Sequence, residues 1–140
     1  MPLTFKTATL QDAQAILSAA ISTAEAVGVK AAIVILDATG DILLAARMDG
    51  AWAGAFDLAL AKANVSRGFA APSGYFAPLV QPGAPLYGVG SVQSGKYLPL
   101  PGGMPVTSPD GLLGAIGVSG GTPDQDTAIA QAGAATLAAG

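Results

Sequence analysis

Two charged residues, Arg47 and Asp49, have the types and spacing that could support chemistry in this chain. They lie in the segment RMDGA at 47–51, between an apolar run and an alanine-rich segment, in a sequence of which only 11% is charged. The chain has no histidine and no cysteine, which removes the usual nucleophile–base pairs and nearly all soft metal ligands. Any chemistry must therefore come from Asp, Lys, Arg, Tyr, Ser or Thr side chains, backbone groups or a bound cofactor.

Two roles are open for this charged pair. Arg47 and Asp49 could form a buried ion pair or a cap that fixes the corner between a strand and a helix. Alternatively, Arg47 could clamp a ligand carboxylate while Asp49 acts as an acid, a base or a ligand anchor. The two roles can coexist, so both stay open.

A lysine among apolar neighbours, Lys62, is a second candidate. Its stem could cover an apolar face while its ammonium reaches water, or a desolvated ammonium could bind an anion or act as a base. Ser66 shares its helical face, and Arg67 is the next residue. One basic face is therefore an alternative, whereas a Ser–Lys dyad is only weakly indicated, because this spacing is common in helices.

A glycine-rich stretch, GAIGVSGG at 114–121, joins an expected strand to an expected helix. Backbone N–H groups in such a turn can hold an anion, so Gly120 and Gly121 are candidates for contacting a ligand carboxylate. The stretch lacks the lysine and spacing of a P-loop and does not match GxGxxG. The alternative is a tight turn that needs glycine backbone angles.

Four further aspartates indicate local structure and no metal site. Asp37 and Asp41 flank an expected turn, where aspartate is common. Asp124 and Asp126 open the last expected helix, where acidic groups complement the helix dipole. A magnesium or calcium site would need more converging oxygen ligands than the sequence places together.

The elements that must position these residues follow from apolar periodicity and from turn residues. Thr9 and Asp12 resemble a capping box, and apolar residues then recur at helical steps until Gly28, which predicts a helix over 9–27. The segment 31–36 predicts a buried strand, residues 37–40 a turn, and 41–47 the returning strand of a hairpin. A second helix is expected over 53–69, with Asp49 just before its start.

The middle of the chain, 71–111, holds eight of the ten prolines, so loops with short edge strands are expected there. It also carries all three tyrosines, Tyr75, Tyr87 and Tyr97, which suit a pocket or a subunit interface. Residues 112–119 again predict a strand. Thr122 followed by proline then predicts the start of a last helix over about 123–138.

Composition limits the class of protein. At 140 residues the chain predicts a single domain over 1–140. Hydrophobic residues make up 51%, and the low charge content predicts a homo-oligomer that covers apolar surface. A net charge of −3 with scattered basic residues argues against nucleic acid as a partner. No apolar run of about 20 residues predicts a membrane span, and no signal peptide is recognised, so the expected location is cytoplasmic.

Five segments in order resemble the GlcG/HbpS family. They are IVILDATG at 33–40, RMDGA at 47–51, KA at 62–63, GGMPV at 102–106 and the glycine-rich stretch at 114–121. The DQD triplet at 124–126 and the alanine-rich tail are also similar, so the resemblance covers nearly the whole chain. The family includes haem-binding or haem-degrading proteins and the carboxy-terminal domain of PduO-type proteins.

The resemblance implies an α+β fold with profilin-like α/β/α layers, in which helices flank a five-stranded antiparallel sheet. It also implies symmetric oligomers, often octamers, and a haem-binding role. Because this chain has no histidine, an axial ligand to haem would have to come from Met48, Met104, a tyrosine, a lysine or a threonine oxygen.

Three functions remain open. The first is a non-enzymatic small-ligand or haem-binding protein with a pocket built by subunit packing, for which the ligand-binding candidates are Arg47, Arg67, Phe69, Met104, Gly120 and Gly121. The second is a cofactor-independent isomerase, hydratase or lyase acting on a small carboxylate or carbonyl compound in a catabolic or biosynthetic pathway. Arg47 or Arg67 would hold its substrate, and the proton would be moved by Asp49, Lys62 or Tyr75. The third is an oligomeric scaffold.

Overall fold

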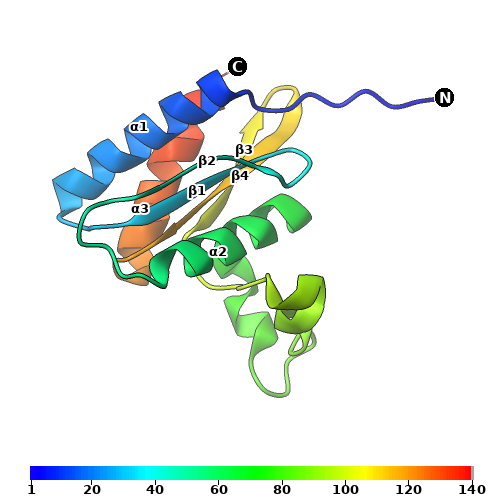
Figure 1. Ribbon diagram of the computed structural model, residues 1–140. Helices are drawn as coiled ribbons and strands as arrows, with labels where there is room; N and C mark the ends of the chain where they lie inside the picture. Colours follow the sequence, from blue (N-terminus) through cyan, green and yellow to red (C-terminus); the bar gives the residue numbers. More distant parts are fainter. Residues whose placement is uncertain (140) are drawn as a thin grey trace.

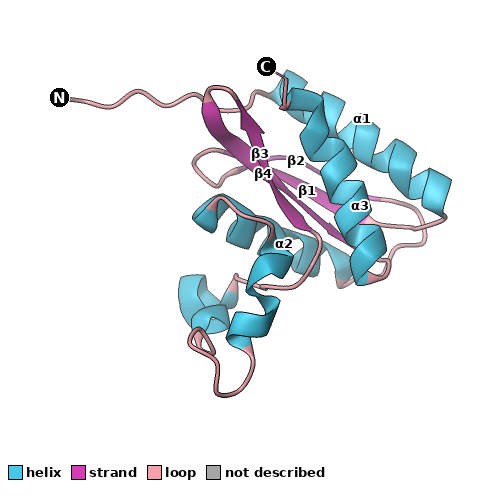
Figure 2. Cartoon of the chain, turned by 180° about the vertical axis from the view of Figure 1, so that it is seen from behind, coloured by secondary structure: helices cyan, strands magenta, loops and turns pink. Residues whose placement is uncertain are grey.

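A computed structural model describes residues 1–139, which form helices on both faces of one antiparallel sheet (Figure 1). Helices α1 and α3 cover one face, and α2 covers the other, as the view from behind also shows (Figure 2). The helices are α1 (Leu10–Val27), α2 (Ala55–Phe69) and α3 (Pro123–Ala134). The strands are β1 (Ala32–Asp37), β2 (Ile42–Arg47), β3 (Gly103–Ser108) and β4 (Gly111–Ser119), in the order β2-β1-β4-β3.

Side-chain caps start two of the three helices where the sequence predicts them. The Thr9 hydroxyl accepts from the backbone N–H of Asp12 at 3.1 Å, and the Asp12 carboxylate accepts from the backbone N–H of Thr9 at 2.9 Å. Thr122 and Gln125 form the same reciprocal pair at the start of α3. These bonds satisfy N–H groups that a helix leaves unpaired at its first turn. Gly28 ends α1 in the left-handed conformation, with φ +77°.

The strand β1 divides the core into two parts because its successive side chains face opposite sides of the sheet. Ile33 and Ile35 point toward α1 and α3, where they pack with Ile16, Ile116 and Ile129. On the opposite face, Val34 and Leu36 pack against α2. Both neighbours of β1, namely β2 and β4, pair with it in antiparallel register. A strand buried on both faces explains the uninterrupted apolar run at 31–36.

The sheet has four strands, so the expected number of five is wrong. The proline-rich segment contributes β3 at an edge and two 3₁₀ helices, η1 (Ser73–Val80) and η2 (Val89–Gly95). Proline has no N–H to donate to a strand ladder, and its fixed φ suits short helical turns. Figure 1 shows these turns as a separate green and yellow-green lobe below α2. The last helix also ends early, since α3 stops at Ala134 and is followed by the turn η3 (Ala135–Leu137).

The turn between β1 and β2 is organised by the Asp37 carboxylate. Its Oδ1 accepts from the Thr39 hydroxyl at 2.7 Å and from the backbone N–H groups of Thr39, Gly40 and Asp41 at 2.9–3.1 Å. Burial alone would raise the pKa of Asp37, but these hydrogen bonds favour the ionised form and together hold the pKa below its ordinary value. The charged carboxylate therefore fixes the shape of this turn.

Helix α2 lies so close to β4 that Gly117 has no room for a side chain. A Cβ built on Gly117 would collide with the carbonyl oxygen of Ala59 and would lie 2.8 Å from the backbone nitrogen of Ala63. The alanines of α2 at this contact are fully buried. Small residues on both elements thus set the spacing between α2 and the sheet.

Replacing Gly117 by alanine should destabilise the fold by about 1–3 kcal/mol, because α2 must move away from β4 to admit the methyl group. Urea unfolding followed by circular dichroism measures this loss. Gly88→Ala is the matched control, since Gly88 has a negative φ and no heavy atom within 4 Å of its Cβ position. Equal stability of the two variants would contradict the close approach described here.

Candidate functional site

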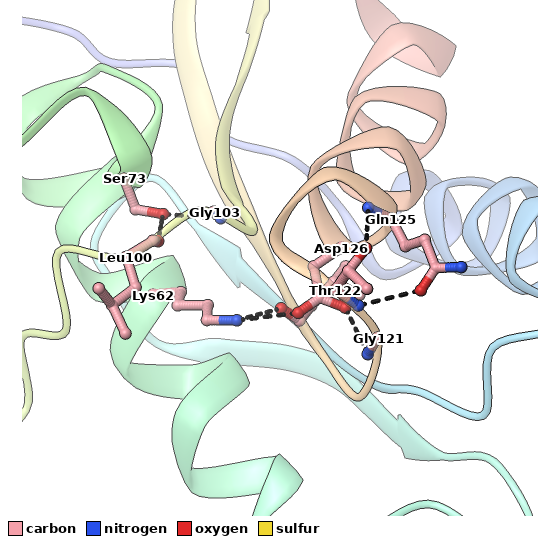
Figure 3. Close-up of polar contacts among 9 residues, drawn as sticks. Lys62, Ser73, Leu100, Gly103, Gly121, Thr122, Gln125 and Asp126 are labelled. Atoms are coloured by element: carbon pink, nitrogen blue, oxygen red, sulfur yellow. Dashed lines mark hydrogen bonds and ion pairs between the residues drawn. The ribbon is translucent and has the colours of Figure 1, made fainter. Parts of the chain in front are cut away.

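The Lys62 side chain is buried and ties α2 to β4 and α3. Its exposed fraction is 5%, and its ammonium lies 3.1 Å from Oδ2 of Asp126 (Figure 3). The same ammonium donates to the carbonyl oxygen of Val118 at 3.0 Å. The Lys62 side chain does not reach water. Of the two roles expected for a desolvated ammonium, binding an anion fits this geometry, with an anion that the protein itself supplies, and a free base does not. The ammonium is instead neutralised by an aspartate 64 residues further along the chain.

The glycine-rich turn holds an anion, and that anion is the carboxylate of Asp126. The backbone N–H of Gly121 donates to Oδ1 of Asp126 at 2.8 Å, as Figure 3 shows. Gly120 has φ +140°, and a Cβ there would lie 2.5 Å from the carbonyl oxygen of Lys30. The candidate ligand contact at Gly121 is therefore occupied by a side chain of the protein itself. Asp126 adds this role to its expected place at the start of the last helix.

The buried side chain of Ser73 connects the proline-rich lobe with the sheet. The Ser73 hydroxyl donates to the carbonyl oxygen of Leu100 and accepts from the backbone N–H of Gly103 at 2.8 Å (Figure 3). Ser66, the expected neighbour of Lys62, has a buried hydroxyl with no hydrogen-bond partner among residues 1–139. The Ser–Lys dyad is thus not formed, because the Lys62 ammonium turns toward Asp126.

Arg47 and Asp49 line a groove between β2 and α1. The groove has a volume of about 530 Å³ and is also lined by Ile21, Glu25 and Met48. Arg47 donates from Nη1 to the carbonyl oxygen of Ala51 at 3.0 Å, and among residues 1–139 it forms no ion pair. The expectation that Asp49 lies just before α2 is wrong, since that helix begins at Ala55 and its first-turn acid is Asp57. The Arg47 side chain therefore stabilises the bend that follows β2, and Asp49 is exposed.

Four aromatic rings gather where α2 meets the proline-rich lobe. The Phe69 ring centroid lies 5.2 Å from that of Phe76 and 5.5 Å from that of Tyr97, and the Tyr75 ring meets Phe76 edge-on at 5.1 Å. We call these four residues the aromatic cluster. Phe69 is 46% exposed and Tyr75 is 67% exposed, so the cluster presents apolar ring surface to its surroundings. Such surface on a small domain commonly marks a binding site.

The other predicted site residues are not brought together. Met104 lies on β3 and packs with the core beneath α1 and α3. Asp49 lines the groove beside α1, Lys62 is buried against Asp126, and Tyr75 lies on η1. Within residues 1–139, no group of three or more His, Cys, Asp or Glu side chains could hold a metal ion. The same residues contain no helix that is long and apolar enough to cross a membrane.

Sequence reasoning missed the partner of Lys62 and the role of Ser73. Asp126 was visible as a helix-start residue, but nothing in its spacing connects it with a lysine on another helix. The glycines at 102, 103 and 120 are a weak indication in the sequence that other groups approach the backbone closely at these positions. A Cβ on Gly102 would lie 3.0 Å from the Lys62 ammonium, and one on Gly103 would lie 2.8 Å from the Ser73 hydroxyl.

The fold defines a three-layer α+β domain with a buried Lys–Asp pair joining the layers. The chain belongs to the HbpS-like family, described as haem degrading protein HbpS-like, which matches residues 8–135.

Known proteins similar to this chain share nearly its whole length. The crystal structure of Klebsiella pneumoniae protein ORFY is 32% identical, with a TM-score of 0.93, over 97% of this chain and 94% of that one. A crystal structure of a PduOC:heme complex is 31% identical, with a TM-score of 0.88, over 96% and 97%. An uncharacterised 15.0 kDa protein from the dhaT-dhaS intergenic region of Citrobacter freundii is 34% identical, over 89% of this chain and 88% of its own length.

Breaking the buried pair should destabilise the protein strongly. Lys62→Met leaves the Asp126 carboxylate buried without its cation, and Asp126→Asn leaves the ammonium unpaired. Each change is expected to cost about 3–5 kcal/mol of unfolding free energy. The double variant Lys62→Met/Asp126→Asn should be more stable than the sum of the two losses implies, because neither charge is then left alone.

Lys30→Met is the control for this experiment, since Lys30 is exposed and lies outside the network. Its effect should stay within about 0.5 kcal/mol. Losses below about 1 kcal/mol for both single variants in urea unfolding would show that the pair does not join the layers as described.

Proposed function

We propose that this chain is a non-enzymatic ligand-binding protein that takes haem, or a similar flat apolar molecule bearing carboxylates, at the aromatic cluster. The observation that carries this proposal is the exposed ring surface of Phe69 and Tyr75 beside the C-terminal end of α2. Support also comes from the relative whose crystal structure is described as a haem complex. Aromatic rings stack on flat ligands and gain energy from the apolar area that they bury.

Among the methionine and tyrosine candidates, the residues present fit haem through a phenol oxygen rather than through sulfur. The Met48 thioether accepts from the backbone N–H of Ala31 at 3.5 Å, and Met104 packs with the core. Exposed phenol groups remain on Tyr75 and Tyr87, and tyrosine is an established axial ligand of haem iron. Tyr75 is the better of the two, because its ring belongs to the aromatic cluster.

The alternative enzyme, an isomerase, hydratase or lyase, has weaker support. A general base must lie within hydrogen-bond reach of the proton that it removes. Asp49, Lys62 and Tyr75 lie on different parts of the molecule, and the Lys62 ammonium is already held by Asp126 and Val118. Binding therefore fits the geometry better than catalysis by these three residues.

Titration with haemin should produce a saturable shift of the Soret band in the wild-type protein. Tyr75→Phe removes the phenol oxygen but keeps the ring, so we expect about tenfold weaker binding and a changed Soret position. Phe69→Ala removes stacking surface and should also weaken binding.

Tyr87→Phe is the matched control, because Tyr87 is 63% exposed and outside the aromatic cluster. It should bind haemin as the wild type does. Absence of a saturable Soret shift in the wild type would overturn the haem assignment. Equal affinities of the Tyr75→Phe and Tyr87→Phe proteins would instead rule out Tyr75 as the iron ligand.

We further propose that the protein is a homo-oligomer that builds its ligand pocket with neighbouring subunits; the family resemblance implies an octamer. Support comes from large apolar side chains exposed on and beside α2, among them Trp52 at 64% and Leu58 at 40%. Apolar surface of this kind on small domains often lies in interfaces.

A charge placed in this surface should break the oligomer. Trp52→Glu is expected to lower the molar mass measured by light scattering to that of a smaller assembly, because an interface excludes an unpaired carboxylate. Leu10→Glu, at an exposed position at the start of α1 on the other face of the sheet, should keep the wild-type mass. A monomeric wild type, or a mass that changes only with Leu10→Glu, would contradict the proposed interface.

A further inference from the structure

A polar pocket distinct from the groove at Arg47 lies between the β1–β2 turn and the end of α2. Its volume is about 500 Å³, within the range of sites for small molecules. Arg67 and Asn64 of α2 form one side, and Thr39 and Gly40 of the turn form another. Lys96 and Tyr97, which follow η2, complete it.

The Arg67 guanidinium packs against the β1–β2 turn and forms no ion pair with any residue in 1–139. A Cβ built on Gly40 would lie 3.1–3.2 Å from Nε, Cζ and Nη2 of Arg67, so the guanidinium rests against a turn position without a side chain. Its Nε is buried and has no hydrogen-bond partner among residues 1–139. A buried donor of a charged group without an acceptor is costly. An anion that accepted a hydrogen bond from Nε of Arg67 would remove that cost.

The second cation, Lys96, is carried by a backbone segment anchored to α2. The Asn64 side chain donates from Nδ2 to the carbonyl oxygen of Lys96 at 3.1 Å, and the backbone N–H of Leu98 donates to the carbonyl oxygen of Ala61 at 3.2 Å. Gln93, which lines the pocket, has the left-handed conformation with φ +58°, and the next residue, Ser94, has φ +56°. These conformations are uncommon for residues with side chains and are enriched at binding sites.

The pocket carries an excess of positive charge in a chain whose net charge is −3. Arg67 and Lys96 are its cations, and neither forms an ion pair within residues 1–139. Among the described residues that line it, Asp41 alone is an anion, and its carboxylate accepts from the Thr39 hydroxyl at 3.4 Å. Asp57 lies beside a neighbouring depression that Lys96 also lines. Two unpaired cations around one cavity favour an anionic ligand.

We propose that this pocket binds a small organic dicarboxylate. The planar guanidinium of Arg67 matches one carboxylate with two parallel N–H donors. Lys96 at the rim attracts the second carboxylate as a point charge, and the Tyr97 hydroxyl offers a further polar contact. The site does not depend on the proposed haem binding, since its charged groups, Arg67 and Lys96, lie outside the aromatic cluster and only Tyr97 is shared by the two.

Calorimetric titration with succinate, butyrate and inorganic phosphate at constant ionic strength tests this site. Succinate should bind more tightly than butyrate, which has one carboxylate, and more tightly than phosphate. Arg67→Gln should weaken succinate binding by about tenfold or more, the factor that a charge-assisted hydrogen bond supports. Arg67→Lys keeps the charge without the planar fork and should restore only part of that loss.

Lys96→Gln tests the contribution of the second cation apart from that of Arg67. Because Lys96 is exposed, this substitution should leave the fold intact. It should weaken succinate binding while leaving butyrate binding unchanged. Lys30→Gln removes an exposed cation elsewhere and should bind succinate as the wild type does. The proposal is overturned if succinate does not bind, if phosphate binds more tightly, or if Lys30→Gln weakens succinate as much as Arg67→Gln does.

Discussion

The buried pair of Lys62 and Asp126 is the constraint on which the layered structure depends. The lysine belongs to the helix on one face of the sheet and the aspartate to a helix on the other, so their 3.1 Å contact joins both outer layers at the end of β4. Two charges removed from water are stable only when their remaining bonds are satisfied. The Val118 carbonyl oxygen and the Gly121 N–H supply those bonds. The glycine-rich turn is therefore part of an internal anion site.

This arrangement fixes the position of α2 and, through it, the lobe that follows it in the chain. The close approach at Gly117 sets the height of the helix above the sheet, and Lys62 fixes the helix along the strand direction. Arg67 and Phe69 follow within two turns of Lys62. Their placement beside the hairpin turn and the aromatic cluster thus follows from contacts in the core. The surface that we propose for ligands is therefore attached to a helix that is fixed by buried contacts.

The sequence predicted the elements whose signals are local. The caps at Thr9 and Thr122 and the stop at Gly28 are confirmed, because a side chain and a backbone group within one helical turn decide them. The prediction of a fifth strand was wrong. A high proline content indicates where regular strands are disfavoured, but it does not indicate which turns form in their place. The partner of Lys62 could not be predicted either, since spacing along one helix carries no information about a residue on another. A glycine that excludes a side chain gives only an indirect sign of such contacts.

The absence of histidine acts differently on the two parts of the lobe. At the aromatic cluster it leaves a phenol oxygen as the iron ligand that the cluster itself offers, because both core-facing thioethers are engaged in packing or hydrogen bonding. At the pocket of Arg67 it has no consequence, since the groups that we propose to hold the ligand there are a guanidinium and an ammonium. Tyr97 belongs to both, with its ring in the cluster and its residue lining the pocket. A ligand with a flat apolar body and acidic groups could engage both parts, whereas a small dicarboxylate needs only the charged one.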